Sequence, residues 1–283
     1  MGQCDGKTAF VTGGSRGIGR AIAKRFAAEG ASVVLCASRM GSHGDLEGTL
    51  EDAVSEIQAA GGKAAAVVAD LSQPEARVGL VERASEPFGP VDILVNNAAA
   101  ARMALPSAST TADRQFMFEV NLQAPVDLAQ QAVPHMKSRG GGWILNITSA
   151  SAVQPEVPYR DSKMAAWIIG PYGSTKAALD RYTRALAHEL AEHDIFVNAM
   201  APVAIVLTQG ADYVRDIARK NPDMVEPVEM MAEAALELCT SRHVGQVVYS
   251  RDIVHAVGRE VRSLDGREVL GDAFMQADVE ATA

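Results

Sequence analysis

The segment TAFVTGGSRGIGRAIAKRFAAEG, residues 8–30, decides the fold of this chain. Thr8–Val11 is a short apolar run of the kind that forms a buried strand. A glycine-rich turn follows, and Arg20–Glu29 then shows helical periodicity before Gly30, a natural helix end. A strand, a glycine turn and a helix in this order point free backbone N–H groups at a phosphate. A glycine-rich turn alone is equally typical of an ordinary loop, and the two flanking elements favour a dinucleotide site.

Three glycines shape the turn, at positions 13, 17 and 19. Gly13 lets the chain turn sharply away from the strand, while Gly17 and Gly19 allow a pyrophosphate and the strand to approach the backbone closely. The spacing differs from the usual G-x-G-x-x-G dinucleotide fingerprint. We expect Ser15 and Ile18 to take part in the same phosphate cradle.

Strands and helices alternate along the rest of the chain. The expected strands are residues 32–37, 64–69, 91–95, 143–148, 195–200 and 245–249, and the expected helices are residues 45–60, 74–88, 111–135, 176–190 and 227–240. This rhythm predicts an α/β fold, a single doubly wound parallel β-sheet with helices on both faces. Ligands bind such sheets at the carboxyl ends of the strands, where Asp70 and Asn97 fall. We expect one catalytic domain over residues 1–250, with residues 251–283 as a C-terminal extension of the same domain.

The end of the second expected strand indicates which dinucleotide fits. An acidic residue about twenty positions after the glycine turn normally holds the ribose 2′-hydroxyl of NAD, whereas an arginine accommodates the 2′-phosphate of NADP. Here the strand is followed by Ser38 and Arg39, and no acid appears between Ser32 and His43. Arg16 in the glycine turn is a second cation suited to that phosphate. The sequence therefore predicts NADP(H), with NAD(H) as the alternative cofactor. The other interpretation is that Arg16 and Arg39 are ordinary surface arginines without a role in binding.

Composition excludes several classes of partner. The 283 residues carry a formal net charge of −9 and contain no basic run, so nucleic acid and anionic membranes are poor partners. No apolar run reaches membrane-spanning length. Cys4, Cys36 and Cys239 lie far apart, in neither a metal-ligand spacing nor a disulfide pattern, so we expect no metal and a reducing, cytoplasmic setting. A small-molecule substrate is the partner that remains.

Two tyrosine–lysine pairs of equal spacing compete for a catalytic role. Tyr172 and Lys176 stand four residues apart, which on one helix places the phenol and the ammonium one turn apart on the same face. A nearby positive charge lowers the pKa of a phenol from about 10, so such a tyrosine can exchange a proton near neutral pH. Tyr159 and Lys163 have the same spacing, and either pair taken alone is more typical of a solvated helix face.

The chain downstream separates the two pairs. After Lys163 it runs into Gly170–Pro171, where the proline prevents one continuous helix. After Lys176 a full helix follows to about Leu190, and the strand over residues 195–200 comes next. We therefore assign the proton-exchanging role to Tyr172 and Lys176.

Three motifs in this order resemble the short-chain dehydrogenase/reductase family: the glycine turn Thr12–Gly19, the run Asn96–Ala99, and a Tyr-x-x-x-Lys. The resemblance spans about residues 7–249 and implies a Rossmann-type fold, a nicotinamide cofactor, and hydride transfer between an alcohol and a carbonyl group. By its distance from Ser149, Tyr159 fits the family's pattern better than Tyr172. The unbroken match from Tyr172 to Asn198 nevertheless favours Tyr172.

The resemblance also implies roles for single residues. Asn121 would anchor a water molecule in a proton relay, Ser149 would hydrogen-bond the substrate oxygen, Tyr172 would exchange the proton, and Lys176 would bind the nicotinamide ribose. Ser151 competes with Ser149, which is the better match by its place after the strand. The expected cofactor-binding residues are Gly13, Ser15, Arg16, Gly17, Ile18, Gly19, Ser38, Arg39, Asp70, Leu71, Asn97, Ala98, Ala99, Tyr172, Lys176 and Thr208.

The chain departs from the family's pattern in three places. Ala99 stands where the family usually has glycine, so we expect a tighter wall of the adenosine side of the site. Val203 also stands in place of a glycine, in the segment that should still pass the nicotinamide and bring Thr208 to its carboxamide. Ser250–Asp252 replaces the Asp-Gly-Gly turn that is frequent in the family.

The choice of Tyr172 leaves residues 150–171 as an enlarged loop beside the expected active site. It holds Val153, Val157, Tyr159, Trp167, Ile168 and Ile169. Two interpretations remain open: the loop walls an apolar substrate pocket, or it packs on its own side chains at the surface. The first predicts a lipid-like, steroid-like or terpenoid alcohol or ketone as substrate. Residues 210–220 are expected to form a helical flap over that substrate.

The C-terminal tail suggests an assembly. Ile253, Val257 and Val261 are spaced to share one helical face, so the tail would pack against a neighbouring subunit or close the site. We expect a homo-oligomer, either a dimer or a tetramer.

Two other functions remain open on the sequence alone. The first is a non-catalytic NADP(H)-binding sensor or scaffold of the same fold, which would have no need of the complete set Asn121, Ser149, Tyr172 and Lys176. The second is an isomerase or dehydratase, against which the absence of a large C-terminal substrate domain argues.

Overall fold

The computed structural model describes residues 2–42, 48–102, 104–153, 168–203, 205–206, 208 and 225–272, with the backbone alone at 168 and 169. Its centre is a seven-stranded sheet in the order β3-β2-β1-β4-β5-β6-β9, in which every neighbouring pair is parallel. The strands are β1 (Thr8–Thr12), β2 (Ser32–Ala37), β3 (Lys63–Val68), β4 (Ile93–Asn96), β5 (Gly142–Ile147), β6 (Ile195–Ala201) and β9 (Val247–Tyr249). The predicted doubly wound parallel sheet is confirmed.

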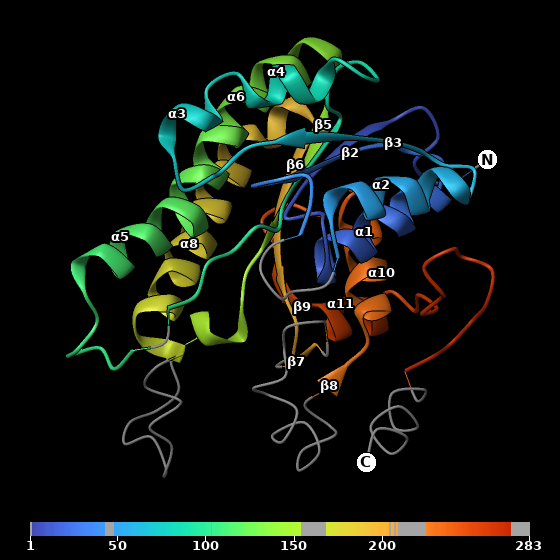
Figure 1. Cartoon of the computed structure of the whole chain (residues 1–283). Coiled ribbons are helices and arrows are strands. Elements are labelled where there is room, and N and C mark those ends of the chain that lie inside the picture. The colour runs from blue at the N-terminus through green and yellow to red at the C-terminus, as the bar shows by residue number, and fades with distance from the viewer. Residues whose placement is uncertain are drawn as a thin grey trace.

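Helices cover both faces of the sheet, as Figure 1 shows. One face carries α1 (Gly17–Ala28), α2 (Leu50–Ala59), α10 (Val228–Leu238) and α11 (Ser250–Ala256). The other carries α3 (Pro74–Arg77), α4 (Leu80–Ser85), α5 (Thr111–Phe118), α6 (Ala124–Arg139) and α8 (Gly173–Leu190). A separate pair of short parallel strands, β7 (Ile205–Val206) and β8 (Val225–Glu226), lies beside α11.

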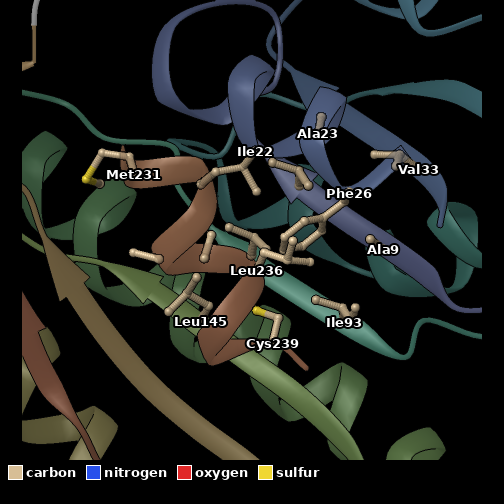
Figure 2. Packing of buried hydrophobic residues seen from close by; sticks show 14 of the residues in the cluster. Ala9, Ile22, Ala23, Phe26, Val33, Ile93, Leu145, Met231, Leu236 and Cys239 are labelled. Carbon is tan, nitrogen blue, oxygen red and sulfur yellow. The ribbon is translucent and has the colours of Figure 1, made fainter. Parts of the chain in front are cut away.

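The two apolar clusters follow from the alternation of side chains along each buried strand. Ala9 and Val11 point into the cluster beneath α1 and α10, whereas Phe10 between them points into the cluster beneath α4 and α6. Figure 2 shows the first cluster, where Phe26 of α1 meets Leu236 of α10 above the sheet. Because both faces are covered, apolar residues follow one another along the central strands and are not confined to alternate positions.

Two predicted helices differ from the structure. The helix expected over residues 74–88 is divided into α3 and α4 at Gly79, whose φ of 63° lies in the left-handed region. The helix expected over residues 111–135 contains a π-turn, η1 (Glu119–Gln123), between α5 and α6. Apolar spacing indicates where a helical region lies, but it does not reveal an inserted residue within that helix.

The prediction for the C-terminal tail was wrong in one respect. The helix α11 ends at Ala256, and Gly258 with φ of 65° follows, so Ile253, Val257 and Val261 do not share a helical face. The following segment packs on its own chain, because Arg259 Nε donates to Glu233 Oε2 at 2.6 Å. Residues 273–283 lie outside the described residues.

No helix in the described part of the chain combines the length and the apolar character that a membrane span needs.

Candidate active site

The turn between β1 and α1 is shaped to receive a phosphate. Gly13 has a φ of 65°, in the region that favours glycine, and no described side chain caps the first N–H groups of α1. A Cβ on Gly19 would lie 2.4 Å from both the Asn97 Nδ2 and the Gly13 carbonyl oxygen, so a larger residue does not fit. The turn therefore leaves the backbone donors of α1 to an anion.

A cleft of about 620 Å³ opens at this turn, along the carboxyl ends of β1 to β4. Among the predicted cofactor-binding residues, its lining includes Gly13, Ser15, Arg16, Ile18, Ser38, Arg39, Asp70, Leu71, Asn97, Ala98, Ala99 and Thr208. Its lining also includes residues that were not predicted to bind the cofactor, namely Cys36, Ala37, Gly41, Gly48, Ala69, Ser72, Ala100, Arg102, Phe116 and Val120. Gly17, Gly19, Tyr172 and Lys176 are not part of this lining.

The lining of the cleft suits an anionic dinucleotide. Arg39 is exposed and Arg16 half-buried, and neither guanidinium forms an ion pair with another described residue. Arg102 is a third cation in the lining, with its Cζ 4.6 Å from the centre of the Phe116 ring. Three cations, free backbone donors and a volume within the usual range for cofactor sites fit a phosphorylated nicotinamide dinucleotide.

Asp70 and Asn97 also shape the loops that line the cleft. The Asp70 Oδ1 accepts hydrogen bonds from the backbone N–H and the hydroxyl of Ser72, at 3.0 and 2.8 Å. The Asn97 Nδ2 donates to the carbonyl oxygens of Thr12 and Gly13, at 2.9 and 3.2 Å. The Asn97 amide therefore fixes the glycine turn, a role that the sequence analysis did not assign.

Asn121 lies within the π-turn η1 and is completely buried. Its Oδ1 accepts from the Ala100 N–H at 2.7 Å, and its Nδ2 donates to the Ala100 carbonyl at 2.8 Å and to the Thr175 Oγ1 at 3.0 Å. Thr175 in turn donates to the Tyr172 carbonyl at 2.7 Å. Asn121 thus connects the loop after β4 to the first turn of α8.

Tyr172 and Lys176 stand on one helical turn at the start of α8. Tyr172 has helical dihedrals and is half-buried, and the Lys176 Nζ lies 5.9 Å from the centre of its ring. Gly170 just upstream is non-helical, with φ of −68° and ψ of −109°, before Pro171. The predicted break ahead of Tyr172 and the helix through Leu190 are confirmed.

Lys176 is almost fully buried, which is unusual for a lysine. Its Nζ donates to the Ile147 carbonyl at 2.9 Å, at the end of β5. Burial lowers the pKa of Lys176 from 10.5 to about 8, while the charge of Asp180 one turn later opposes that shift. The ammonium is therefore held near Tyr172, at a protonation equilibrium close to neutral pH.

Ser149 follows β5 and precedes a short helical turn, η2 (Ala150–Ala152), that packs against α8. Its Oγ accepts from the Ser151 N–H at 3.2 Å and from the Ser151 Oγ at 2.9 Å. The two serines that competed in the sequence analysis are therefore hydrogen-bonded partners.

Some of the predictions fall outside the described residues. These are Tyr159 and Lys163, most of the 150–171 loop with Trp167, and the flap at 210–220.

Other features near the site were not predicted from the sequence. Asp180 stands one helical turn after Lys176, a spacing that the sequence does display, whereas the Ile147 carbonyl and the Thr175 hydroxyl gave no signal because their contacts depend on the fold.

The family model of short chain dehydrogenases matches residues 7–218. Hydroxysteroid dehydrogenase-like protein 2 of Danio rerio is 31% identical over 287 residues, covering 99% of this chain and 66% of that protein. The chain thus spans about two thirds of the length of that relative.

Two solved structures with bound ligands resemble the chain. L-sorbose reductase of Gluconobacter frateurii, complexed with NADPH and L-sorbose, has a TM-score of 0.73 and 32% identity over 87% of this chain and 95% of that one. A 7α-hydroxysteroid dehydrogenase, complexed with NADH and 7-oxo glycochenodeoxycholic acid, has a TM-score of 0.74 and 32% identity over 87% and 92%.

Proposed function

The chain belongs to the short-chain dehydrogenase family, and we propose that it interconverts a secondary alcohol and a ketone with NADP(H) as its cofactor. The observation that carries this proposal is the buried Lys176 ammonium one helical turn from Tyr172, at the carboxyl edge of the sheet that also forms the cleft. A bound nicotinamide supplies or accepts the hydride. The protein's own side chains move the proton and orient the substrate.

Tyr172 is the proposed acid and base of the reaction. Its phenol donates a proton to the carbonyl oxygen during reduction and takes it back during oxidation. The Lys176 ammonium, 5.9 Å from the ring centre, stabilises the phenolate that remains after donation. Because the ammonium donates to the Ile147 carbonyl, its position is fixed before substrate binds.

Ser149 is the proposed partner of the substrate oxygen, with Ser151 orienting it. A hydroxyl oxygen accepts two hydrogen bonds and donates one. The N–H and the hydroxyl of Ser151 fill both acceptor positions of the Ser149 Oγ. The Ser149 proton is then directed away from Ser151, and it can bind the negative charge that develops on the substrate oxygen.

Asn121 holds the proton-relay region in place. Its side chain bridges Ala100 and Thr175, and Thr175 donates to the Tyr172 carbonyl. We propose that this bridge fixes the start of α8 relative to the end of β4. The water-anchoring role expected of Asn121 remains part of the same proposal.

The preference for NADP(H) is supported by Arg16 and Arg39. Both line the cleft, and Ser38 and Arg39 are the first residues after β2, where an NAD-specific site would place a carboxylate. Structures of about equal similarity contain NADPH in one case and NADH in the other, so this chain's own arginines carry the choice.

We further propose an apolar, steroid-like or lipid-like substrate. The match of hydroxysteroid dehydrogenase-like protein 2 over 99% of the chain and the steroid-bound structure support this class, whereas the sorbose-bound structure is the polar counterexample. The proposal includes a homo-oligomer, to be tested by light scattering, and a reducing, cytoplasmic setting that suits the three free cysteines.

A substrate screen tests the proposed function. Purified protein is mixed with NADPH or NADH and a panel of steroid ketones, aliphatic ketones and ketoses, and loss of reduced-cofactor absorbance is followed. Turnover of a ketone with NADPH preferred over NADH is the expected result. Tight NADPH binding without turnover of any ketone or secondary alcohol would instead support the sensor alternative.

A further inference from the structure

A second buried ionisable group lies near the site, apart from the proposed Tyr172–Lys176 pair. Glu226, the last residue of β8, is completely buried, as is Ser250 at the start of α11. The Ser250 hydroxyl contacts the Glu226 Oε1 closely and also lies 3.2 Å from the Ala201 carbonyl oxygen. The Val203 backbone N–H is a further donor to the Glu226 carboxyl group.

The number of hydrogen bonds that this cluster can satisfy depends on whether Glu226 is ionised or neutral. The Ser250 hydroxyl has one proton and two acceptors in reach, the Glu226 carboxyl group and the Ala201 carbonyl. If Glu226 is ionised, that proton can serve only one acceptor. If Glu226 is neutral, its own O–H donates to Ser250, and Ser250 donates to Ala201, so both contacts are satisfied. The Glu226 Oε2 has no hydrogen-bond partner among the described residues, which also suits the neutral acid better than a buried carboxylate.

The cluster lies where the chain leaves the sheet toward the proposed nicotinamide site. Ala201 is the last residue of β6, and Val203 follows it after one proline. The segment then forms β7, in which Val206 pairs with Glu226 itself. Beyond β7, Thr208 lines the cleft and faces the glycine turn, since a Cβ on Gly17 would lie 3.6 Å from the Thr208 Cβ.

We propose that Glu226 is a positioning residue for the nicotinamide end of the cleft. In its neutral form it closes a hydrogen-bonded chain from Glu226 through Ser250 to Ala201, which holds in place the described part of the segment after β6, namely Pro202, Val203, β7 and Thr208. Ionisation of Glu226 reverses the Ser250 hydroxyl, releases Ala201 and loosens that segment. This inference rests on the proposed cofactor site, because it acts through Thr208.

Burial raises the pKa of Glu226 from 4.5 to about 7, so both forms are populated near neutral pH. The neighbouring charges act in opposite directions. Arg251 of α11 favours the ionised form, and Asp272 opposes it. Arg251 and Asp272 are themselves paired at 3.0 Å, and His255 lies 3.4 Å from the same Asp272 carboxylate.

The test compares Glu226→Gln, Ser250→Ala and a control, Glu233→Gln. The glutamine amide can donate permanently to Ser250, so it mimics neutral Glu226 at every pH. Glu233 is also buried, but it pairs with Arg25 and Arg259 and has no contact with the Glu226–Ser250 pair among the described residues, so its variant reports destabilisation alone. The dissociation constant of NADPH is measured for the full chain by fluorescence titration between about pH 5.5 and about pH 8.5. Any protonation of NADPH itself over this range affects all variants equally.

The expected wild-type affinity weakens about three- to tenfold across a midpoint near pH 7, beyond the change that Glu226→Gln shows. Ser250→Ala is expected to bind at the weaker level throughout, and Glu233→Gln to keep the wild-type pH dependence. Parallel curves for wild type and Glu226→Gln would overturn the inference.

Urea unfolding without cofactor provides a second measurement that does not depend on the proposed function. The pKa of Glu226 is higher in the folded than in the unfolded chain, so wild type loses stability as pH rises toward about 7 and Glu226→Gln does not. The folding constant of Glu226→Gln relative to wild type should rise at least about tenfold between about pH 5.5 and about pH 8.5. A constant ratio would refute the neutral-acid chain even if no ketone were ever turned over.

Discussion

Replacement of Lys176 by methionine should make the unliganded protein more stable at neutral pH while it abolishes turnover. Lys176 is 2% exposed, and burial lowers its pKa from 10.5 to about 8. Below about pH 8 the folded chain must hold this ammonium in its interior. Methionine has a similar length and no charge, so it relieves that energetic penalty.

The magnitude follows from the pKa. Each pKa unit corresponds to about 1.4 kcal/mol, so the fall from 10.5 to about 8 represents roughly 3 kcal/mol of destabilisation at pH 7. The variant leaves the Ile147 carbonyl without its donor, which costs about 1 kcal/mol. Lys176→Met is therefore expected to unfold with a free energy about 2 kcal/mol higher than wild type at pH 7.

The sign of this effect depends on pH. The depressed pKa means that the penalty is complete below about pH 8, decreases as pH rises, and disappears above about pH 10.5, where lysine is neutral in both states. Urea unfolding of the unliganded proteins, followed by circular dichroism at about pH 7 and about pH 10, measures this trend. The advantage of the variant should be lost at the higher pH.

Lys24→Met is the matched control, because Lys24 is only half-buried and its only ion pair among the described residues is with Glu56 at 3.3 Å. Its unfolding free energy should change by less than about 1 kcal/mol. If Lys176→Met is destabilised at both pH values, the ammonium is better accommodated than its burial indicates, and the reasoning fails.

Three further predictions concern single contacts. Tyr172→Phe should lower kcat about 10²- to 10⁴-fold with little change in the dissociation constant of NADPH, measured by steady-state kinetics and fluorescence titration; turnover at the wild-type rate would remove Tyr172 from the mechanism. Replacement of Arg16 and Arg39 by alanine should raise the KM for NADPH about tenfold or more and leave that for NADH nearly unchanged, so an equal effect on both would contradict the assignment of the 2′-phosphate site. Glu233→Gln should lower the free energy of unfolding by roughly 3 kcal/mol in urea titrations, because it leaves the buried Arg25 without its charged partner 2.6 Å away; a change below about 1 kcal/mol would show that Glu29 alone suffices for Arg25.

Local patterns were sufficient to predict most of the fold. The strand and helix around the glycine turn, and the helix after Tyr172, are each encoded within about twenty neighbouring residues by apolar spacing and by Gly or Pro at their ends. The break at Gly79 was missed because the apolar spacing continues across it and only the left-handed backbone interrupts the helix. The π-turn at Asn121 was missed for the same reason, since an inserted residue changes the helix without changing its composition.

The contacts that hold the site residues in place were harder to predict from the sequence. Asn121 binds Ala100 and Thr175, which are 21 and 54 positions away along the chain. Ser250 reaches Ala201 across 49 positions. No periodicity links such residues, because their proximity depends on the order of strands in the sheet. Residue identity predicted which groups would carry chemistry, and the fold was needed to find the contacts that hold them.

The buried ionisable groups Arg25, Lys176 and Glu226 are of two kinds. One is paired with opposite charges and keeps its charge near neutral pH, and the others lack such direct pairing. Arg25 is buried between Glu233 and Glu29, and these carboxylates raise its pKa, so its charge does not change near neutral pH. Among the described residues, the Lys176 ammonium donates a hydrogen bond to one carbonyl, and the Glu226 carboxyl group meets a hydroxyl and a backbone N–H. Burial therefore outweighs the favourable contacts of both groups, and it brings their pKa values to about 8 and about 7. Arg25, held between two carboxylates, joins α1 to α10 at a fixed charge. The groups of Lys176 and Glu226 are less well compensated, so each can gain or lose a proton near neutral pH.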